Sequence, residues 1–423
     1  MNIKRIKVEG LFRIFTHEIL FNDNVTIIMG ENGVGKTVTL NLIDAIFNAR
    51  FDYLMDIEYS NIVVTFLKET WTINRSFSKG RKGIKTDLRI TPSKKDAKPF
   101  EINSDMLLPT LPVYVEKVDD DTWYNSRSHS YYDKEQVYDR YGMEASGKTF
   151  LVPEWYRRQM DRNKVKMIKT QRLITTSGNR RDNPSIYTVK NYSNELMKLM
   201  QEEMNNAGQG GAEIDRTFPV RLLKFMKAHI AYSPSELFQD LNELDTYRHK
   251  LSSVGLLPEV DAENADDALV RELDKLDKNM LSVMHLYVKD SREKLKKYDS
   301  IYNKVSILRD IINTRFNHKK LFIDSKKGFV FLPSDQRDDE IPVEKLSSGE
   351  QNELVLFYEL LFKCDTKDLI LIDEPEISLH LAWLQAMIGD LQRITQENGA
   401  SLLIATHSPD FVGDNYELVQ NLG

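Results

Sequence analysis

The order of hydrophobic and polar positions divides the chain into a strand-rich beginning, a helical middle and an end where strands and helices alternate. In the first part, short apolar or alternating runs predict strands at residues 3–8, 25–29, 61–67, 71–77 and 165–168. A helical pattern over residues 40–47 follows a glycine-rich turn. Residues 119–155 are polar and tyrosine-rich, and they predict an irregular insertion.

The middle of the chain predicts several helices, because apolar residues recur at i, i+3 and i+4 in residues 193–204, 219–230 and 233–251. Residues 205–211, Asn-Asn-Ala-Gly-Gln-Gly-Gly, predict a flexible break between the first two helices. Ser233 and Ser235 lie where N-caps are expected. Residues 265–315 predict one long helix whose heptad-like stretch is too short for a long coiled coil.

The end of the chain returns to strands. Residues 321–324 and 328–332 predict a hairpin, and continuous apolar runs at residues 369–372 and 402–405 are typical of parallel strands buried on both faces. The whole pattern predicts an α/β fold, in which a mixed N-terminal β lobe and a parallel sheet flanked by helices are interrupted by a helical insertion.

Composition limits the class of protein. The 423 residues allow two or three domains, and 41% hydrophobic with 29% charged residues is typical of a soluble globular chain. The formal charge of -6 gives no overall attraction to nucleic acid, so such a contact must be local. Cys364, the single cysteine, excludes an internal disulfide and suits a reducing cytoplasm. No run approaches the roughly 20 apolar residues of a membrane span, so we expect a cytoplasmic protein.

Residues 30–37 match the phosphate-loop pattern G-x-x-x-x-G-K-(S/T), and the predicted strand before them and helix after them supply its structural context. The eight candidate residues are Gly30, Glu31, Asn32, Gly33, Val34, Gly35, Lys36 and Thr37. Glycines let backbone amides wrap phosphates at a helix N-terminus. Lys36 is expected to hold the β- and γ-phosphates, and the Thr37 hydroxyl to ligate Mg²⁺. Residues 142–149 match the same pattern, but they lack a preceding strand and Pro153 follows closely, so we interpret them as a chance match.

Two later apolar strands end in polar residues. Asp373 and Glu374 follow residues 369–372. Charge at the end of a buried strand destabilises the fold unless a cation is bound or a proton is transferred there. Asp373 is therefore a candidate magnesium ligand, and Glu374 a candidate base that activates the attacking water. His407 follows the strand at 402–405 and is a candidate sensor of the γ-phosphate. A lone histidine at a strand end is more often structural, but its place beyond the carboxylate strand favours a functional role.

Residues 346–351, L-S-S-G-E-Q, precede a helical pattern. Small residues at a helix N-terminus form an anion site, for which the candidates are Ser347, Ser348, Gly349 and Glu350. A plain helix cap at Ser347 or Ser348 is the alternative. The phosphate loop, this segment, the strand ending D-E-P-E and the late histidine occur in the order found in ABC-class ATPases. The chain resembles the chromosome-maintenance and break-repair group of that class, and not its transporters.

The resemblance implies that the chain binds ATP and Mg²⁺ and hydrolyses ATP. It also implies that the chain pairs head-to-tail with a second copy, whose residues 346–351 (the signature segment) cover the nucleotide. Assembly into oligomers larger than a dimer is an open alternative. By the same resemblance, an ABC-type ATPase head comprises three parts of the chain. These are residues 1–118 with the phosphate loop, residues 165–190 with the loop that contains Gln171 (the Gln-loop), and residues 319–423 with the signature segment and the carboxylate strand. An irregular insertion at 119–164 and a helical arm at 191–318 separate these parts.

Residues 374–380 and 168–173 look like the compact bacterial ATPases of anti-phage systems of the Septu, PARIS and retron-associated types. By that resemblance, Gln171 links magnesium and the attacking water to the helical insertion. Two positions depart from the wider family. Ser348 stands where many members have glycine, and His380 stands where transporters carry an aspartate.

Two functional hypotheses follow. The first is a switch that senses an infection and controls a separate effector such as a nuclease, because no nuclease constellation is seen and little chain follows His407. The second is a DNA-repair or DNA-processing clamp that works with a nuclease, supported by the basic stretch at residues 156–172. A charged surface beside the nucleotide site is the competing interpretation of that stretch.

Overall fold

The structure is a computed structural model, and it describes residues 2–22, 24–80, 83–103, 115–118, 122–128, 130–133, 152–168, 184–227, 233–258, 276–334, 339–366, 368–377 and 381–422. The chain forms two compact units. The first comprises Met1–Thr170, Asp365–Ile377 and Met387–Gly423. The second comprises Gln171–Cys364 and Ser378–Ala386. In the described part, no helix is both long and apolar enough to cross a membrane.

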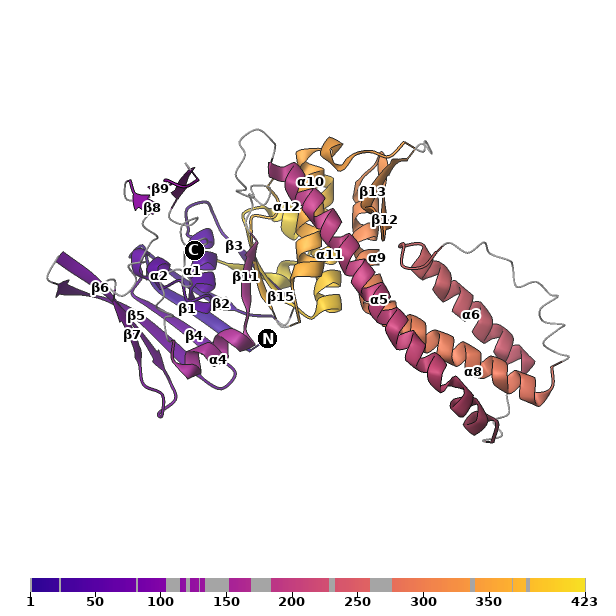
Figure 1. Cartoon of the computed structure of the whole chain (residues 1–423). Coiled ribbons are helices and arrows are strands. Elements are labelled where there is room, and N and C mark those ends of the chain that lie inside the picture. The colour runs from indigo at the N-terminus through magenta and orange to yellow at the C-terminus, as the bar shows by residue number, and fades with distance from the viewer. Residues whose placement is uncertain are drawn as a thin grey trace. The chain divides into compact units, whose positions relative to one another are not determined.

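The first unit contains a six-stranded antiparallel sheet with strand order β2-β1-β4-β5-β6-β7. Its strands are β1 (Ile3–Leu11), β2 (Phe15–Leu20), β4 (Asn61–Phe66), β5 (Thr70–Gly80), β6 (Gly83–Pro92) and β7 (Phe100–Asn103). Alternate residues of β4 are fully or nearly fully buried, which is the pattern of a sheet with one face on the core. The N-terminal strands predicted from alternation are confirmed, and the sheet extends further than predicted (Figure 1).

A five-stranded parallel sheet forms the other half of this unit, in the order β11-β14-β15-β3-β16. Its strands are β3 (Val25–Met29), β11 (Val165–Ile168), β14 (Leu369–Asp373), β15 (Ser401–Thr406) and β16 (Val419–Asn421). Every residue of β14 and β15 is buried, so the predicted strands buried on both faces are confirmed. The register aligns Asp373 with Ala405 and Thr406 with Met29, which places the carboxyl ends of three strands together.

Helix α1 (Lys36–Phe47) packs between the two sheets, since its apolar residues share one core with residues of both. The first unit also contains the helices α2 (Phe51–Asp56), α4 (Glu154–Arg162) and α12 (Pro409–Val412), and the part of α11 (Leu381–Asn398) from Met387 onward. Tyr156 of α4 is fully buried and stacks on Trp71 with ring centroids 4.7 Å apart. Aromatic packing therefore fixes α4 to the antiparallel sheet. Two strands within the segment predicted to be irregular, β9 (Thr122–Asn125) and β10 (Ser130–Asp133), form a small sheet with β8 (Val115–Lys117), which lies just before that segment.

The second unit is mainly helical. Its long helices are α5 (Pro184–Lys227), α6 (Pro234–Ser252), α8 (Lys278–Leu295) and α9 (Asp299–Arg315). The predicted hairpin is confirmed as β12 (Lys319–Asp324) and β13 (Gly328–Pro333). A 3₁₀ turn (Val343–Lys345) leads to α10 (Ser348–Tyr358), which continues as a π-helix (Glu359–Lys363). The two units together confirm the predicted α/β class with a helical insertion (Figure 1).

Two helix predictions are wrong. Helix α5 runs without interruption through residues 205–211 and through Pro219, where a flexible break and a new helix were expected. The physical reason is tertiary packing: α5 packs against α8 and the 3₁₀ turn that follows α8, and Ala207 within this stretch is buried. Conversely, the predicted long helix over residues 265–315 is divided by a 3₁₀ turn (Lys296–Tyr298) into α8 and α9.

The cap prediction for α6 is half right. Ser233 caps the helix, because its side chain accepts from the Glu236 amide and the Glu236 carboxylate accepts from the Ser233 amide. Ser235 lies inside the first turn instead, with its hydroxyl 3.0 Å from that of Ser233.

Candidate functional site

The phosphate loop connects the carboxyl end of β3 to the N-terminus of α1, as predicted. Gly33 and Gly35 have φ angles of 88° and 93°, which favour glycine. A Cβ at Gly30 would lie 2.6 Å from the Leu422 carbonyl oxygen, so this position also requires glycine. The first turn of α1 has no side-chain cap and no acidic residue, which leaves its amides able to bind an anion.

Lys36 is 5% exposed, and its ammonium group lies against the backbone of the loop. Its Nζ donates to the carbonyl oxygens of Gly30 at 2.7 Å and Glu31 at 2.9 Å. The positive charge is thus held inside the concave loop, where phosphate oxygens would replace neutral carbonyls as its acceptors. A cavity of about 660 Å³ adjoins the loop, and its lining comprises Met29, Gly30, Glu31, Asn32, Val34, His407, Pro409, Asn421 and Leu422.

Thr37 and Asp373 meet at the centre of the site. The Thr37 hydroxyl donates to Asp373 Oδ2 at 2.8 Å across 336 positions of sequence. Burial raises the pKa of the Asp373 carboxyl above its usual value, and the neighbouring Glu374 and Glu376 raise it further, whereas the Thr37 hydrogen bond and Lys36 lower it. Three neighbouring carboxylates, those of Asp373, Glu374 and Glu376, favour a bound cation, which would stabilise their charged forms.

The residues at this point fit Mg²⁺. This ion is usually bound by one or two protein oxygens, and phosphates and water complete its coordination. The Thr37 hydroxyl and the Asp373 carboxylate supply two such oxygens side by side. The part of the chain that the structure describes has no group of three or more His, Cys, Asp or Glu arranged to hold a metal ion.

Glu374 and His407 also come together, from the ends of the neighbouring strands β14 and β15. The Glu374 carboxylate lies 3.5 Å from His407 Nδ1. The Glu374 backbone has a φ of 44°, a left-handed conformation that costs about 1–3 kcal/mol for a non-glycine residue. The Glu374 amide donates to the Ala405 carbonyl at 2.8 Å, which ties this turn to β15. Strain at a candidate base is typical of a functional site.

Two further residues of the site were not predicted. Glu376 accepts from the Thr406 hydroxyl at 2.6 Å and from the His407 amide at 3.2 Å. The last acid of the D-E-P-E run is the sequence signal that was available for it. His17 of β2 is buried beneath the loop, with its Nδ1 2.9 Å from the Thr39 hydroxyl, and burial lowers its pKa. Its place at a buried position of an alternating strand gave no sign of this contact.

The signature residues belong to the second unit, at the N-terminus of α10. Ser347 is the N-cap, since its hydroxyl accepts from the Glu350 amide at 3.3 Å and its amide donates to Glu350 Oε2 at 2.7 Å. The prediction of a cap at Ser347 or Ser348 is therefore settled in favour of Ser347. Lys319 Nζ lies 3.0 Å from Glu350 Oε2 and holds the same carboxylate. Gly349 follows in the first turn.

A buried ion pair anchors the signature helix α10. Arg315, at the end of α9, donates to the Glu353 carboxylate, and their side chains are 3% and 0% exposed. The Arg315 guanidinium also lies over the Phe357 ring, 4.8 Å from its centroid. The pair therefore connects the signature helix to the last helix of the arm, within the second unit.

Three sequence predictions fall outside the described residues. Gln171, the second G-x-x-x-x-G-K-T match at residues 142–149, and His380 all belong to this group. The assignment of Gln171 to catalysis and magnesium remains a prediction.

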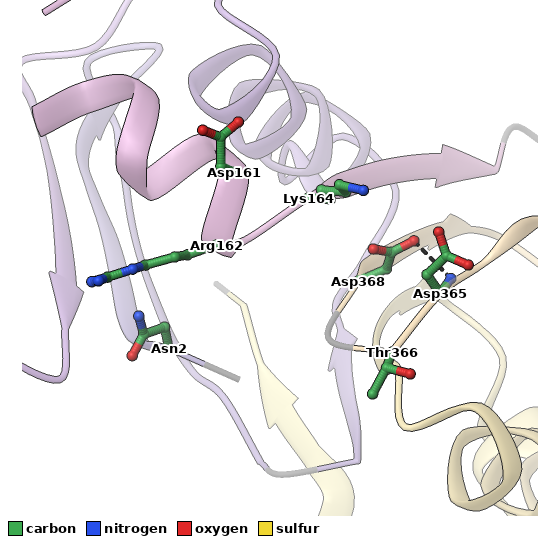
Figure 2. A pocket seen from close by; sticks show the side chains of 7 residues that line it. All are labelled: Asn2, Asp161, Arg162, Lys164, Asp365, Thr366 and Asp368. Atoms are coloured by element: carbon green, nitrogen blue, oxygen red, sulfur yellow. Dashed lines mark hydrogen bonds between the residues drawn. The ribbon is translucent and has the colours of Figure 1, made fainter. Parts of the chain in front are cut away.

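A second pocket, of about 530 Å³, lies at the amino ends of β11 and β14, the opposite edge of the parallel sheet. Figure 2 shows its lining, which comprises Asn2, Asp161, Arg162, Lys164, Asp365, Thr366 and Asp368. Asp368 accepts from the Asp365 amide at 2.9 Å and pairs with Lys166 at 2.7 Å. Charges of both signs meet here, so this pocket is not a continuous basic surface for a phosphate backbone.

The comparisons with known proteins point the same way as the loop and the carboxylates. A family model described as "AAA ATPase domain" matches residues 1–412. UvrABC system protein A of Clostridium acetobutylicum is 27% identical over 141 residues, which is 33% of this chain and 13% of that protein. The same protein of Listeria monocytogenes serotype 4b is 32% identical over 71 residues, or 17% of this chain and 7% of that protein. The chain thus matches only about an eighth or less of the length of these relatives.

Among solved structures, the SMC head domain from Thermotoga maritima matches 100% of this chain and 94% of its own, at a TM-score of 0.33 and 12% identity. The Smc head domain of Pyrococcus furiosus, with an extended coiled coil and bound to the C-terminal domain of ScpA, matches 97% of this chain and 91% of its own, also at a TM-score of 0.33 and 12% identity. Agreement at this level is too weak to support a conclusion about the present chain.

Proposed function

The chain belongs to the AAA ATPase domain family, and from this premise we propose that it is an ATPase of the ABC class that hydrolyses ATP held between two facing copies of itself. The observation that carries the proposal is the hydrogen bond between Thr37 and Asp373, with Glu374 next to it. It joins the phosphate loop to the carboxylate strand in the arrangement that phosphoryl transfer to water requires.

In the proposed mechanism, Lys36 and the first amides of α1 bind the phosphates of ATP. Thr37 and Asp373 are the residues that would hold Mg²⁺, which when bound neutralises charge on the phosphate oxygens. Glu374 orients the attacking water and accepts its proton. His407, 3.5 Å from Glu374, faces the cavity beside the loop and contacts the γ-phosphate. Gln171 is proposed to connect this centre to the helical insertion.

The proposed dimer places the N-terminus of α10 of one copy against the ATP held by the other. Ser347, Ser348 and Gly349 begin this helix, and a helix N-terminus favours a phosphate. The support is the order of motifs along the chain, which resembles that of ABC-class ATPases in which this pairing occurs. Further association of such dimers is compatible with the same site.

For the biological role, we propose that the ATPase is the sensor or regulator of an anti-phage defence complex and controls a separate effector, such as a nuclease. The support is the likeness of residues 374–380 and 168–173 to the Septu, PARIS and retron-associated ATPases. Purification of the chain expressed from its native operon is expected to yield a second protein in a fixed ratio. Recovery of the ATPase alone, at a concentration where ATP-dependent dimers persist, would contradict this role.

A DNA-processing clamp is the alternative function, favoured by the similarity to UvrABC system protein A and by the basic stretch that includes α4. Arg157 and Arg158 are exposed there, but Arg158 lies 2.6 Å from Glu154 and Asp161 follows one turn later. These acids offset the attraction of α4 for phosphates.

We therefore expect the double variant Arg157→Glu and Arg158→Glu to bind duplex DNA as the wild type does, because the stretch is a solvated surface. Fluorescence anisotropy across a salt series measures this. If α4 grips DNA, the variant instead loses affinity and the slope of log K against log salt falls by about 0.9 for each lost phosphate contact. Glu417→Gln, an exposed change of charge elsewhere in the same unit, is the control.

A further inference from the structure

Glu376 lies just beyond β14, and its side chain is 7% exposed. One of its oxygens, Oε1, accepts two hydrogen bonds from the end of β15. The donors are the Thr406 hydroxyl at 2.6 Å and the His407 amide at 3.2 Å. The Ser408 amide in turn donates to the Thr406 hydroxyl at 3.0 Å. A single carboxylate oxygen therefore organises three consecutive residues that surround the candidate sensor histidine.

The imidazole of His407 lies between two carboxylates. Its Nδ1 is 3.4 Å from Glu376 Oε1 and 3.5 Å from Glu374 Oε1. Acceptors on one ring nitrogen fix the proton there and determine which way the other nitrogen faces. Because Nδ1 faces the two carboxylates, Nε2 is the atom left to meet a ligand in the cavity that His407 lines.

The second carboxylate oxygen of Glu376 shows that this arrangement destabilises the fold. Oε2 is buried and makes no hydrogen bond within the described part of the chain. A buried carboxylate with an unsatisfied oxygen destabilises a fold, and Glu376 also raises the pKa of the nearby Asp373 carboxyl. A neutral glutamine would tie the end of β15 to β14 at lower cost. The negative charge therefore needs a reason other than stability.

We propose that Glu376 is a positioning residue for ATP hydrolysis, which orients the His407 ring so that Nε2 faces the γ-phosphate while Nδ1 stays beside Glu374. This inference rests on the proposed ATPase function. Glu376 touches neither nucleotide nor water in this role. It acts through Thr406 and His407, and its charge keeps the proton of the imidazole on Nδ1.

The test compares Glu376→Ala with Glu376→Gln in the full chain. Glutamine keeps an oxygen that accepts from Thr406 and the His407 amide but removes the charge, whereas alanine removes both. Loss of a carboxylate that orients a histidine typically costs about 10–100-fold in activity, so we expect kcat to fall by that factor in both variants. The KM for ATP is expected to change little, because the phosphate loop is untouched. Glu417→Gln, which removes one exposed negative charge elsewhere in the same unit, is the control for the change of net charge.

A structural tie and a positioning role give different results. If Glu376 only ties two strand ends, glutamine restores the wild-type kcat, and alanine lowers the thermal midpoint and ATP affinity together with kcat. Either result overturns the proposal. A kcat that stays low in Glu376→Gln, with a thermal midpoint equal to or above that of the wild type, supports it.

A spectroscopic measurement separates this inference from the proposed function. Nitrogen-15 NMR of labelled histidine, with His407 assigned by its loss in His407→Gln, reports which ring nitrogen carries the proton. We expect the proton on Nδ1 in the wild type and a shift toward the other tautomer in both Glu376 variants. An unchanged tautomer in Glu376→Ala would sink the inference even if ATP is hydrolysed. Absence of ATP hydrolysis by the wild type would instead sink the proposed function and leave the tautomer result standing.

Discussion

Glu374→Gln is expected to lower ATP turnover by at least about 100-fold while ATP binding persists, since a positioned general base contributes about 10²–10⁴-fold. The amide has the shape of the carboxylate but cannot accept the proton of the attacking water. The strained backbone at φ 44° and the hydrogen bond from the Glu374 amide to Ala405 are unaffected by this change. Because bound ATP would then remain intact, the closed dimer should accumulate, which light scattering after size exclusion measures.

Lys36→Ala is the contrasting variant. It removes the ammonium held within the loop, and charge-assisted hydrogen bonds contribute about 1.5–3 kcal/mol, so affinity for ATP should fall by roughly 10–150-fold. Titration with a fluorescent ATP analogue separates the two variants. Normal turnover in Glu374→Gln would show that another group is the base. A monomeric Glu374→Gln protein at saturating ATP would contradict the dimer.

Glu353→Ala is expected to destabilise the helical unit by about 3–5 kcal/mol, because it leaves the buried Arg315 charge without its main carboxylate. Amide hydrogen exchange followed by mass spectrometry measures the effect within α9 and α10. A loss of this size corresponds to exchange that is faster by about 100-fold or more in these helices, while the antiparallel sheet of the other unit exchanges as before.

The double variant Arg315→Met and Glu353→Leu is the control for that result. Replacing a buried ion pair by apolar residues of similar volume is often neutral or stabilising, so exchange in α10 should return close to the wild-type rate. If the double variant is as unstable as Glu353→Ala, the unpaired charge of Arg315 is not the cause of the instability, which contradicts the prediction.

The centre of the site could be predicted because its signals are local. Each polar residue lies at the carboxyl end of a short buried strand: Asp373 is the last residue of β14, and His407 directly follows β15. In a parallel sheet the carboxyl ends meet, so position along the sequence was enough to bring these residues together. The phosphate loop has the same property, since its strand and helix adjoin it.

Other features depend on contacts between distant segments, which no local pattern shows. Glu376 is recognised only by its bonds to residues 30 positions away, and His17 by its contact with Thr39 under the loop. The glycines of α5 favoured a break, since each costs about 1 kcal/mol in a helix, but α5 packs against α8 and the following 3₁₀ turn and buries Ala207 in this stretch. Tertiary packing, and not local propensity, therefore keeps α5 continuous.

The strand order of the parallel sheet also determines when the proposed site is first complete during synthesis of the chain. The antiparallel sheet pairs neighbours within the first 103 residues, so it can fold while the ribosome is still translating the arm. The phosphate loop emerges early as well, but its strand β3 pairs with β15, which is translated more than 370 residues later. A nascent chain thus carries the phosphate loop without Asp373, Glu374 and His407, and the proposed site is complete only after β14 and β15 have left the exit tunnel.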